Sequence, residues 1–564
     1  MKLRGAEYIV RIIELLEAET LFAYPGGAIL PIYDALASTT LNNVLVRHEQ
    51  GASLAANAFG RVKGKPGFCL GTSGPGATNL VTGIADAYAD SVPMIAITGQ
   101  VPTTLIGSDA FQETDITGIC IPITKKTYLI TDIKQAKDYF LDAYKVSMHG
   151  RPGPVLIDIP KDVQNAEIEL DDNWEQSIVI PERHRTFEVH REQLFEAREI
   201  TAQAKKPLII AGHGVLLAEA SDELRDFAAR EQIPAISTIM GIGAFKEEDP
   251  LYFSWLGMHG MKYANDAVQN CDLIIAMGIR FDDRITGKLD EFAPNAKVIH
   301  VDIDASENNK NVNTDLFLHA DIKRLLAECP DTRTDDNKKV REEWIKYLSD
   351  ERSKYPLQEP NFEKLTEISA IAKLEKAMSD DAFICTDVGQ HQMWAAQYMT
   401  RLNANHFVSS CGLGTMGFGL PAAMGIQAAF PENEVWCITG DGSIQMNIQE
   451  LVTFAQEGYP IKVLLLENTY LGMVRQWQEQ FYAKNYSGVE LLNPDFKMLS
   501  EAFGVKSARV DNIEDYERVL KEARETEGPF LIHAMVPREE NVFPMVPPMK
   551  SLSETMYYPE NVNN

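Results

Sequence analysis

The sequence predicts an α/β protein with three doubly wound parallel-sheet domains. The chain has 564 residues, and at roughly 150 residues per domain this length allows about four units or three larger ones. Its 45% hydrophobic and 24% charged residues are typical of globular proteins. Short β-branched segments alternate with longer helical patterns along the whole chain, which is the order of elements in parallel sheets.

The first block of alternating elements is predicted to form a domain over 1–165. The expected strands lie at 44–46, 68–70, 94–97 and 155–159, with helices over 52–62 and from about 77. An acidic segment with few strand-forming residues follows, and we interpret 166–187 as a linker.

The second and third blocks repeat this pattern. A domain over 188–330 is expected to contain a helix at 191–204 and strands at 207–211, 273–276 and 297–301. Residues 331–362 begin charged and turn-rich and are interpreted as a second linker region. A third domain over 363–540 has expected strands at 383–386, 435–439, 461–466 and 529–533, and 541–564 is left as a C-terminal tail.

Charge and cysteine usage limit the classes of function. With 53 basic and 81 acidic residues the net charge is −28, which disfavours binding to nucleic acid or to an anionic membrane surface. The longest apolar segments are strand-length, far below the roughly 20 residues that span a bilayer. The seven cysteines are scattered without a Cys-x-x-Cys pair, which indicates reduced core thiols and a cytoplasmic protein. The first 17 residues look like an amphipathic helix rather than a signal peptide.

The strongest chemical signal is TGDGS at 439–443 followed by Glu467 and Asn468. The residues between them predict one βαβ crossover, so Asp441 and Asn468 emerge at the carboxyl ends of neighbouring strands, where open α/β sheets bind ligands. A carboxylate and an amide oxygen suit Mg²⁺. Gly440 and Gly442 allow the main chain to approach a diphosphate at the start of the next helix. Taken alone, a Gly-Asp-Gly sequence is about as often a simple turn as a ligand-binding loop.

Nearly all of the chain resembles the large catalytic subunit of acetohydroxyacid synthase (acetolactate synthase), a thiamine-diphosphate enzyme family. The matching segments are YPGGA at 24–28, HEQG at 48–51, AFQE at 110–113, RPGP at 151–154, GIRFDDR at 278–284, GLGTMG at 412–417 and GMVRQW at 472–477. Two positions depart from the family pattern, Glu467 where an asparagine is usual and Ala320 where a glycine is usual.

This resemblance implies that the enzyme decarboxylates pyruvate and joins the hydroxyethyl carbanion to a second 2-oxo acid. Pyruvate would give 2-acetolactate and 2-oxobutyrate would give 2-aceto-2-hydroxybutyrate, in the first common step of valine, leucine and isoleucine biosynthesis. The implied role of Glu49 is to protonate the cofactor's aminopyrimidine, so that its 4′-nitrogen can remove the thiazolium C2 proton. Met416 is implied to bend the cofactor, and Gly414 to hold its pyrimidine.

The resemblance also assigns further site residues. The other reaction residues are Gly27, Gln112, Lys161 and Arg284, and Phe111 and Trp477 shape the substrate pocket. Thiamine diphosphate is held by Gln390, His391, Gly442, Ser443 and Met473, and Mg²⁺ by Asp441, Asn468 and Tyr470. FAD is the third implied cofactor, with matching positions Arg151, Gly212, Gly214, Thr238, Met258, His259, Arg280, Asp282, Asp302 and Asp321. Catabolic acetolactate synthases lack FAD and the RFDDR segment, so its presence favours the biosynthetic branch.

Several single residues also have simpler interpretations. Arg284 beside Asp282 and Asp283 has the pattern of a surface salt bridge, Met416 and Trp477 could fill the core, and a lone histidine such as His391 is more often structural. The alternative functions are an FAD-containing pyruvate oxidase and a catalytically silent nucleotide-binding protein on the same scaffold. The expected assembly is a homodimer or homotetramer with active sites shared between chains, together with a small regulatory subunit.

Overall fold

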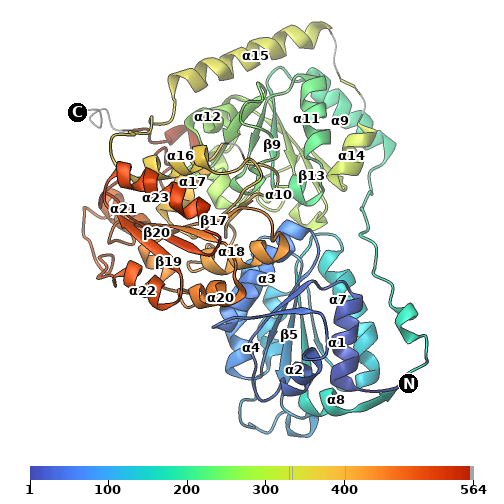
Figure 1. Cartoon of the computed structure of the whole chain (residues 1–564). Coiled ribbons are helices and arrows are strands. Elements are labelled where there is room, and N and C mark those ends of the chain that lie inside the picture. Colours follow the sequence, from blue (N-terminus) through green and yellow to red (C-terminus); the bar gives the residue numbers. More distant parts are fainter. Residues whose placement is uncertain (330, 333–334, 401, 559–564) are drawn as a thin grey trace. The chain divides into compact units, whose positions relative to one another are not determined.

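A computed structural model describes residues 1–329, 331–332, 335–400 and 402–558. Within these residues the chain forms three six-stranded sheets and one two-stranded sheet (Figure 1). The predicted fold class, α/β with three doubly wound parallel-sheet domains, is confirmed. No helix in this part of the chain combines the length and the apolar character that crossing a membrane requires.

The first sheet has the strand order β3-β2-β4-β5-β7-β6, and its neighbouring strands are parallel. Its strands are β2 (Thr20–Ala23), β3 (Asn42–Leu45), β4 (Gly67–Gly71), β5 (Met94–Gln100), β6 (Lys126–Leu129) and β7 (Pro154–Pro160). The four expected strands of this block correspond to β3, β4, β5 and β7. Its helices are α1 (Gly5–Leu15), α2 (Leu30–Leu36), α3 (Glu49–Lys63), α4 (Pro75–Asn79), α5 (Val81–Ala89), α6 (Ile116–Cys120), α7 (Ala136–Met148) and α8 (Lys161–Asn165).

Alternate side chains of these strands enter two separate cores. Leu21 and Phe68 pack in a cluster with residues of α1, α2 and α7. Their neighbours Phe22 and Cys69 point to the other face, where the cluster includes α3 and α5. This alternation follows from the two-residue period of a strand, and burial of both faces is typical of parallel sheets.

The third sheet has the order β16-β15-β17-β18-β20-β19. Its strands are β15 (Phe383–Thr386), β16 (Phe407–Val408), β17 (Val435–Gly440), β18 (Lys462–Glu467), β19 (Lys506–Val510) and β20 (Phe530–Met535). Its helices are α18 (Gly419–Ala429), α19 (Asp441–Ile444), α20 (Glu450–Glu457), α21 (Gly472–Phe481), α22 (Phe496–Ala502) and α23 (Ile513–Glu525). Helix α18 shares a continuous apolar core with α3, so the first and third sheets belong to one compact unit.

The second sheet has the order β11-β10-β9-β12-β13-β14 and is parallel throughout. Its strands are β9 (Pro207–Ala211), β10 (Ala235–Ser237), β11 (Tyr252–Trp255), β12 (Leu273–Met277), β13 (Lys297–Asp302) and β14 (Leu316–His319). Its helices are α9 (Arg191–Gln203), α10 (His213–Leu217), α11 (Ser221–Glu231), α12 (Lys262–Asn270), α13 (Asp283–Thr286) and α14 (Ile322–Glu328). These elements form the second compact unit.

The second unit also takes in segments that the sequence assigns elsewhere. It includes α16 (Glu367–Ala377), most of α17 (Gln390–Tyr398) and the chain from Glu539 onward. Within it, the predicted C-terminal tail is tied down by a hydrogen bond from Val546 N to Met258 O of 2.7 Å. The six domain and linker ranges stay a prediction, and residues 559–564 of the tail lie outside the described residues.

Both predicted linkers contain regular structure. Residues 166–187 include β8 (Glu167–Glu169), which pairs antiparallel with β1 (Lys2–Arg4). The second linker contains a 20-residue helix, α15 (Asp335–Lys354), although its charged start indicates turns. Residues 330, 333 and 334 of that start lie outside the described residues. Most residues of α15 are charged or polar, so its sequence shows little of the apolar pattern of a helix. A few positions, including Trp344 and Leu348, are nevertheless buried against neighbouring elements.

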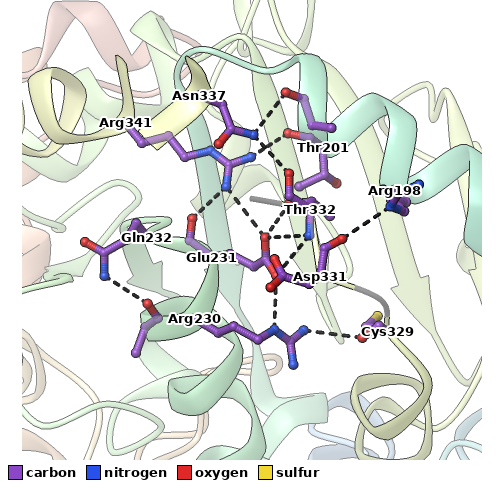
Figure 2. A network of polar contacts seen from close by, with 12 residues as sticks. Arg198, Thr201, Arg230, Glu231, Gln232, Cys329, Asp331, Thr332, Asn337 and Arg341 are labelled. Carbon is purple, nitrogen blue, oxygen red and sulfur yellow. Dashed lines mark hydrogen bonds and ion pairs between the residues drawn. The ribbon is translucent and has the colours of Figure 1, made fainter. Parts of the chain in front are cut away.

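Helix α15 is anchored by a buried ion pair. Figure 2 shows Arg341 of α15 beside Glu231 at the end of α11. Both side chains are fully buried, with Nη1 3.7 Å from Glu231 Oε2. The guanidinium also donates to Glu231 O at 2.6 Å and Thr201 O at 2.7 Å. Since a buried charge without a partner is costly, this pair links α15 to the second sheet's helices.

We predict that Arg341→Met destabilises the unit of the second sheet by about 3–5 kcal/mol, because it leaves Glu231 buried with less compensation. The measurement is the midpoint of the first unfolding transition in urea. Lys346→Met is the matched control, since Lys346 lies on the same helix in an exposed pair with Asp350 and should change stability by less than about 0.5 kcal/mol. Equal midpoints for the two variants would contradict the anchoring role.

Candidate functional site

Each six-stranded sheet contains an inner point at which the strand order changes direction. In the described chain this point lies between β2 and β4, between β9 and β12, and between β15 and β17. Loops that leave the carboxyl ends of two such strands run in opposite directions and open a crevice for ligands. Most of the predicted site residues fall at these three positions.

The crevice of the third sheet carries the Gly-Asp-Gly motif. Asp441 begins α19 directly after β17, and Asn468 directly follows β18. Asp441 Oδ2 accepts a hydrogen bond of 2.8 Å from Thr469 N, while Asn468 Oδ1 accepts one of 3.0 Å from Tyr470 N. The structure therefore brings the two predicted metal ligands to one loop cluster. The main chain of Tyr470 lies at this cluster, while its ring lies under the guanidinium of Arg538, 4.6 Å from the ring centroid.

Glycines allow neighbouring segments to approach the motif closely. A Cβ on Gly440 would lie 3.0 Å from His391 Nδ1, and one on Gly442 would lie 3.8 Å from Met416 Cε. A Cβ on Gly472 would overlap Gln390 Oε1 and approach Asn468 Nδ2. Gln390, His391 and Met416 therefore converge on the motif from separate segments of the chain.

Three other predicted cofactor positions lie on α19, on α21 and in the segment before α18. Ser443 Oγ turns back to Gly440 O at 3.2 Å, which stabilises the start of α19. Gly414 has a φ of +74° and open space where a Cβ would be, a conformation that favours glycine. Met473 lies on α21 one turn before Trp477.

His391 is suited to receive a ligand atom. Burial lowers its pKa to about 4, so the imidazole is neutral at neutral pH. Its buried Nε2 has no hydrogen-bond partner among the described residues. The neutral imidazole carries a single ring proton, and in the tautomer with that proton on Nε2 it can donate to a diphosphate oxygen.

Asn493 supports the motif and was missed by sequence reasoning. Its Nδ2 donates to Asp441 Oδ2 at 2.8 Å and to Glu467 Oε1 at 2.9 Å. Glu467, the position that departs from the family pattern, also bonds to buried His533. Burial raises the pKa of Asp441 to about 6, and the bonds from Asn493 and Thr469 oppose that rise. Asn493 lies 25 residues after Asn468 in an irregular segment, so no periodic pattern marks it.

The crevice of the first sheet contains Glu49. This buried residue begins α3, and its Oε2 accepts a hydrogen bond of 2.9 Å from Asn79 Nδ2. Its Oε1 lies 3.2 Å from where a Cβ on Gly76 would be, and the same position touches Thr72. Thr72 in turn accepts from Ala28 N at 3.2 Å. Glu49 thus lies at the junction of the loops that follow β2, β3 and β4.

The main chain before Glu49 is held by a residue of the third sheet's helices. Glu450, at the start of α20, accepts from Arg47 N at 3.0 Å and from His48 N at 3.2 Å. Burial raises the pKa of Glu450 to about 7, and these backbone bonds oppose the rise. A Cβ on Gly51 would lie only 2.7 Å from Glu450 Oε1. The first turn of α3 therefore depends on both sheets of its unit.

The other predicted residues of the first sheet are spread along its edges. Gly27 is exposed with open space around it, and Gln112, at φ +60°, touches the Gly74 turn beside Thr72. Phe111 is 88% exposed. Lys161 starts α8 directly after β7, at the carboxyl edge of the sheet. Arg151 precedes β7 and donates to Ser91 Oγ at 2.7 Å, so it lies at the opposite edge from Glu49.

The crevice of the second sheet is lined by closely packed glycines. A Cβ on Gly212 would lie 2.2 Å from Gly278 O, and one on Gly214 would lie 2.6 Å from Gly278 Cα. The turns after β9 and β12 can approach this closely only because these positions lack side chains. The predicted residues Thr238, Arg280, Asp282, Asp302 and Asp321 follow or end β10, β12, β13 and β14 at the same carboxyl edge.

Several of these residues already have partners within the protein. Asp282 caps α13 by accepting from Arg284 N, and burial raises its pKa. Asp321 caps α14 and pairs with Arg185 at 3.1 Å. Asp302 Oδ1 accepts from Asp304 N at 2.8 Å. Asp321 therefore has a structural role regardless of any ligand.

Arg284 and Met258 lie together. Arg284 Nη1 donates to Met258 Sδ at 3.1 Å, and its side chain is 58% exposed with Asp283 3.6 Å away. This geometry is compatible with the simple surface pair and also leaves the guanidinium accessible to an anion. His259, next to Met258, is buried, and burial lowers its pKa to about 4.

Trp477 lies on α21, half-buried, with its ring edge-on to Phe481 at 5.8 Å between centroids. Its indole Nε1 is buried without a hydrogen-bond partner in the described part of the chain. The buried residues Trp174 and Trp255 share this feature in the described chain, so it does not separate a core position from a pocket position.

Together, the three sheets and the residues at their points of strand-order reversal define an α/β protein whose third sheet is suited to a diphosphate. Three domain families match the chain: thiamine pyrophosphate enzyme, N-terminal TPP binding domain over 3–119; thiamine pyrophosphate enzyme, central domain over 194–329; and thiamine pyrophosphate enzyme, C-terminal TPP binding domain over 387–534.

Full-length relatives are more specific. The acetolactate synthase isozyme 2 large subunit of Escherichia coli is 45% identical over 98% of this chain and 99% of the relative. The acetolactate synthase large subunit of Corynebacterium glutamicum is 45% identical over 99% and 90%. The probable acetolactate synthase large subunit of Methanococcus aeolicus is 42% identical over 98% and 95%. The chain belongs to the acetolactate synthase large-subunit family of thiamine pyrophosphate enzymes.

Proposed function

We propose that this chain is the catalytic subunit of a biosynthetic acetolactate synthase. It decarboxylates pyruvate and transfers the two-carbon unit to a second 2-oxo acid, either pyruvate or 2-oxobutyrate. This is the first common step of branched-chain amino-acid biosynthesis. The observation that carries the proposal is the cluster of Asp441 and Asn468 at the carboxyl ends of adjacent strands, near the ring of His391, whose Nε2 has no partner among the described residues.

Thiamine diphosphate and Mg²⁺ fit the crevice of the third sheet. Among the described residues no three His, Cys, Asp or Glu side chains form a metal cluster. A cation there would use Asp441, Asn468 and the main chain of Tyr470, and would take other oxygens from the diphosphate and water, as Mg²⁺ commonly does. Gln390, His391, Gly442, Ser443 and Met473 are the proposed diphosphate-side residues. When bound, thiamine diphosphate supplies the electron sink for decarboxylating a 2-oxo acid and joining the remainder to a carbonyl.

The reaction residues of the first sheet have separate tasks. Glu49 holds a proton at the cofactor's pyrimidine, and Asn79 fixes the orientation of its carboxylate. Gly27 offers an exposed backbone N–H to a developing oxyanion. Gln112, Phe111 and Lys161 belong to the substrate side of the site. Met416, beside Gly442, and Gly414 shape the place of the pyrimidine.

The substrate carboxylate and the acceptor side chain need different partners. The accessible guanidinium of Arg284 can hold a carboxylate through two parallel hydrogen bonds. Trp477 offers a half-buried aromatic face, which favours the extra methylene of 2-oxobutyrate over pyruvate.

FAD is proposed at the second sheet. The glycine turn at Gly212 and Gly214 and the acids Asp282 and Asp302 at strand ends suit a dinucleotide and its ribose hydroxyls. The remaining proposed positions are Arg151, Thr238, Met258, His259, Arg280 and Asp321. Because the carboligation transfers no net electrons, the role proposed for FAD is structural.

The assembly and location follow the same reasoning. A small regulatory subunit is proposed, since relatives are named large subunits. A homodimer or homotetramer with shared sites is proposed because Glu49 and Asp441 follow strands of different sheets, so a symmetric assembly can combine them across chains. A cytoplasmic location is proposed because all seven cysteines are free thiols and most are buried.

The proposal is tested by supplying pyruvate with thiamine diphosphate, Mg²⁺ and FAD and identifying the product. We expect acetolactate, bound flavin that stays oxidised, and no oxygen uptake matching turnover. Asp441→Ala should lose cofactor binding and activity, because it removes the carboxylate that links metal to protein. Oxygen uptake equal to turnover would identify a pyruvate oxidase instead. Absence of any reaction with intact cofactor binding would identify a silent nucleotide-binding protein.

A second prediction concerns the residue behind the metal ligand. Asn493→Ala should weaken Mg²⁺ binding about 10- to 100-fold, because it frees Asp441 from its oriented hydrogen bond. Mg²⁺ titration of the protein by calorimetry in the presence of thiamine diphosphate measures the change. Asn512→Ala is the control, since Asn512 is the N-cap of helix α23 in the same domain and makes no hydrogen bond to Asp441. Equal Mg²⁺ affinities in the two variants would contradict the role of Asn493.

Sharing of the site between chains is tested by mixing two inactive variants, Glu49→Gln and Asp441→Asn. If the site combines Glu49 of one chain with Asp441 of another, a mixed dimer contains one site with both changes and one with neither. Random mixing makes about half the dimers mixed, so about a quarter of wild-type activity should return. If both groups came from one chain, every site would keep a change and co-expression would restore nothing.

A further inference from the structure

The loop that carries Gly414 and Met416 is held by buried carboxylates at both ends. After Met416, Asp387 at the end of β15 accepts hydrogen bonds from Gly417 N at 2.7 Å and Gly419 N at 3.3 Å. Before Met416, the acceptors are Asp86, which lies on helix α5 beside the first sheet, and Asp90, the residue that directly follows this helix. Met416 therefore lies between anchors that come from two different sheets of one unit.

Asp86 closes the loop by binding two of its hydroxyl groups. Its Oδ2 accepts from Ser410 Oγ and from Thr415 Oγ1, each at 2.5 Å. Ser410 Oγ in turn accepts from Thr415 N at 2.8 Å. One carboxylate oxygen thus fixes two residues that are five positions apart, and the second adjoins Met416.

Neighbouring groups hold Asp86 and the start of the loop. Asn57 of α3 donates to Asp86 Oδ1 at 2.9 Å. Asp90 accepts from Gly412 N at 2.7 Å and pairs with Arg61 at 2.6 Å, and the same guanidinium donates to Ser409 O at 2.8 Å. All of these side chains are buried.

Because Asp86 is buried, its carboxylate depends on these hydrogen bonds. Burial raises the pKa of Asp86 to about 6, the charge of Asp90 adds to the rise, and the hydroxyls of Ser410 and Thr415 oppose it. Two of the donors to this buried carboxylate belong to the loop. A loop conformation without them would leave the carboxylate buried with too few partners, which is disfavoured.

We propose that Asp86 is a positioning residue for the reaction: through Ser410 and Thr415 it fixes the 410–417 loop so that Met416 stays beside Gly442 in the crevice of the third sheet. In this proposal Asp86 acts through Met416 and does not contact the substrate. The proposal rests on the proposed function, because it assumes that Met416 sets the bent conformation of the cofactor. Asp86 would then be a residue of helix α5 that determines the position of Met416, and it lies outside the segments that carry the family resemblance.

The first test follows the loop in the protein without cofactor. Amide hydrogen exchange of the peptide covering 409–418 should be faster in Asp86→Asn than in wild type, while other peptides are unchanged. Thr415→Val removes one of the loop's two donors to Asp86 with little change of shape and should give the same local effect, even if Asp86→Asn does not fold. Asp272→Asn is the matched control, because Asp272 also holds a loop, in its case through two backbone N–H groups beside the second sheet. Unchanged exchange in both Asp86→Asn and Thr415→Val overturns the proposal.

The second test asks whether the restraint matters for the cofactor. The rate at which the C2 proton of bound thiamine diphosphate exchanges with deuterium should fall about 10- to 100-fold in Asp86→Asn or Thr415→Val, as expected for a small misplacement at a reacting centre. Affinity for thiamine diphosphate should be largely kept, since the diphosphate residues are unchanged. Met416→Ala should show a similar loss, and adding Asp86→Asn to it should cost little more, because both changes act on one contact.

The outcomes separate this proposal from the proposed function. If amide exchange of the 409–418 peptide is faster but the C2 exchange rate is unchanged, the positioning role is overturned and the proposed function stays intact. Full additivity of Asp86→Asn and Met416→Ala overturns it as well. If wild-type protein itself neither binds thiamine diphosphate nor exchanges its C2 proton, the proposed function fails and this proposal fails with it.

Discussion

The packing of α3 against α18 is the contact on which the candidate site depends. A Cβ on Gly425 of α18 would lie 2.1 Å from Ala55 O of α3, so the two helices meet at main-chain distance. Their side chains form one apolar core with alternate residues of the first and third sheets. Glu49 at the start of α3 and the 410–417 loop before α18 are therefore fixed by the same interface.

Buried carboxylates complete this interface at its polar points. Glu450 holds the main chain before Glu49, while Asp86 and Asp90 hold the 410–417 loop. In each case the acid belongs to one sheet and accepts from backbone or hydroxyl donors of the other. Such groups are stable in the interior only with nearly complete hydrogen bonding. They consequently make the relative placement of the two strand edges specific, where apolar contacts alone would tolerate shifts.

The three sheets share one way of building a crevice. At each reversal of strand order, small residues let two loops approach: Gly26 meets Thr72, Gly212 meets Gly278, and Gly440 meets the ring of His391. A repeated topology thus yields three different lining chemistries, a carboxylate in the first, strand-end acids in the second and a metal-ligand pair in the third. Fold supplies the location, and the side chains that follow each strand supply the chemistry.

The sequence alone determined the fold class, the strands with strong apolar character and the Asp441 and Asn468 pair, because these depend on local pattern and on the fixed geometry of a βαβ crossover. It did not reveal α15, whose charged surface conceals a few buried contacts such as Arg341 with Glu231. It also missed Asn493, Glu450 and Asp86, which lie far along the chain from the residues they hold. Their importance comes from burial and from hydrogen bonds between segments up to about 400 residues apart. Only the tertiary structure brings such pairs together, because no periodicity within either segment encodes its partner.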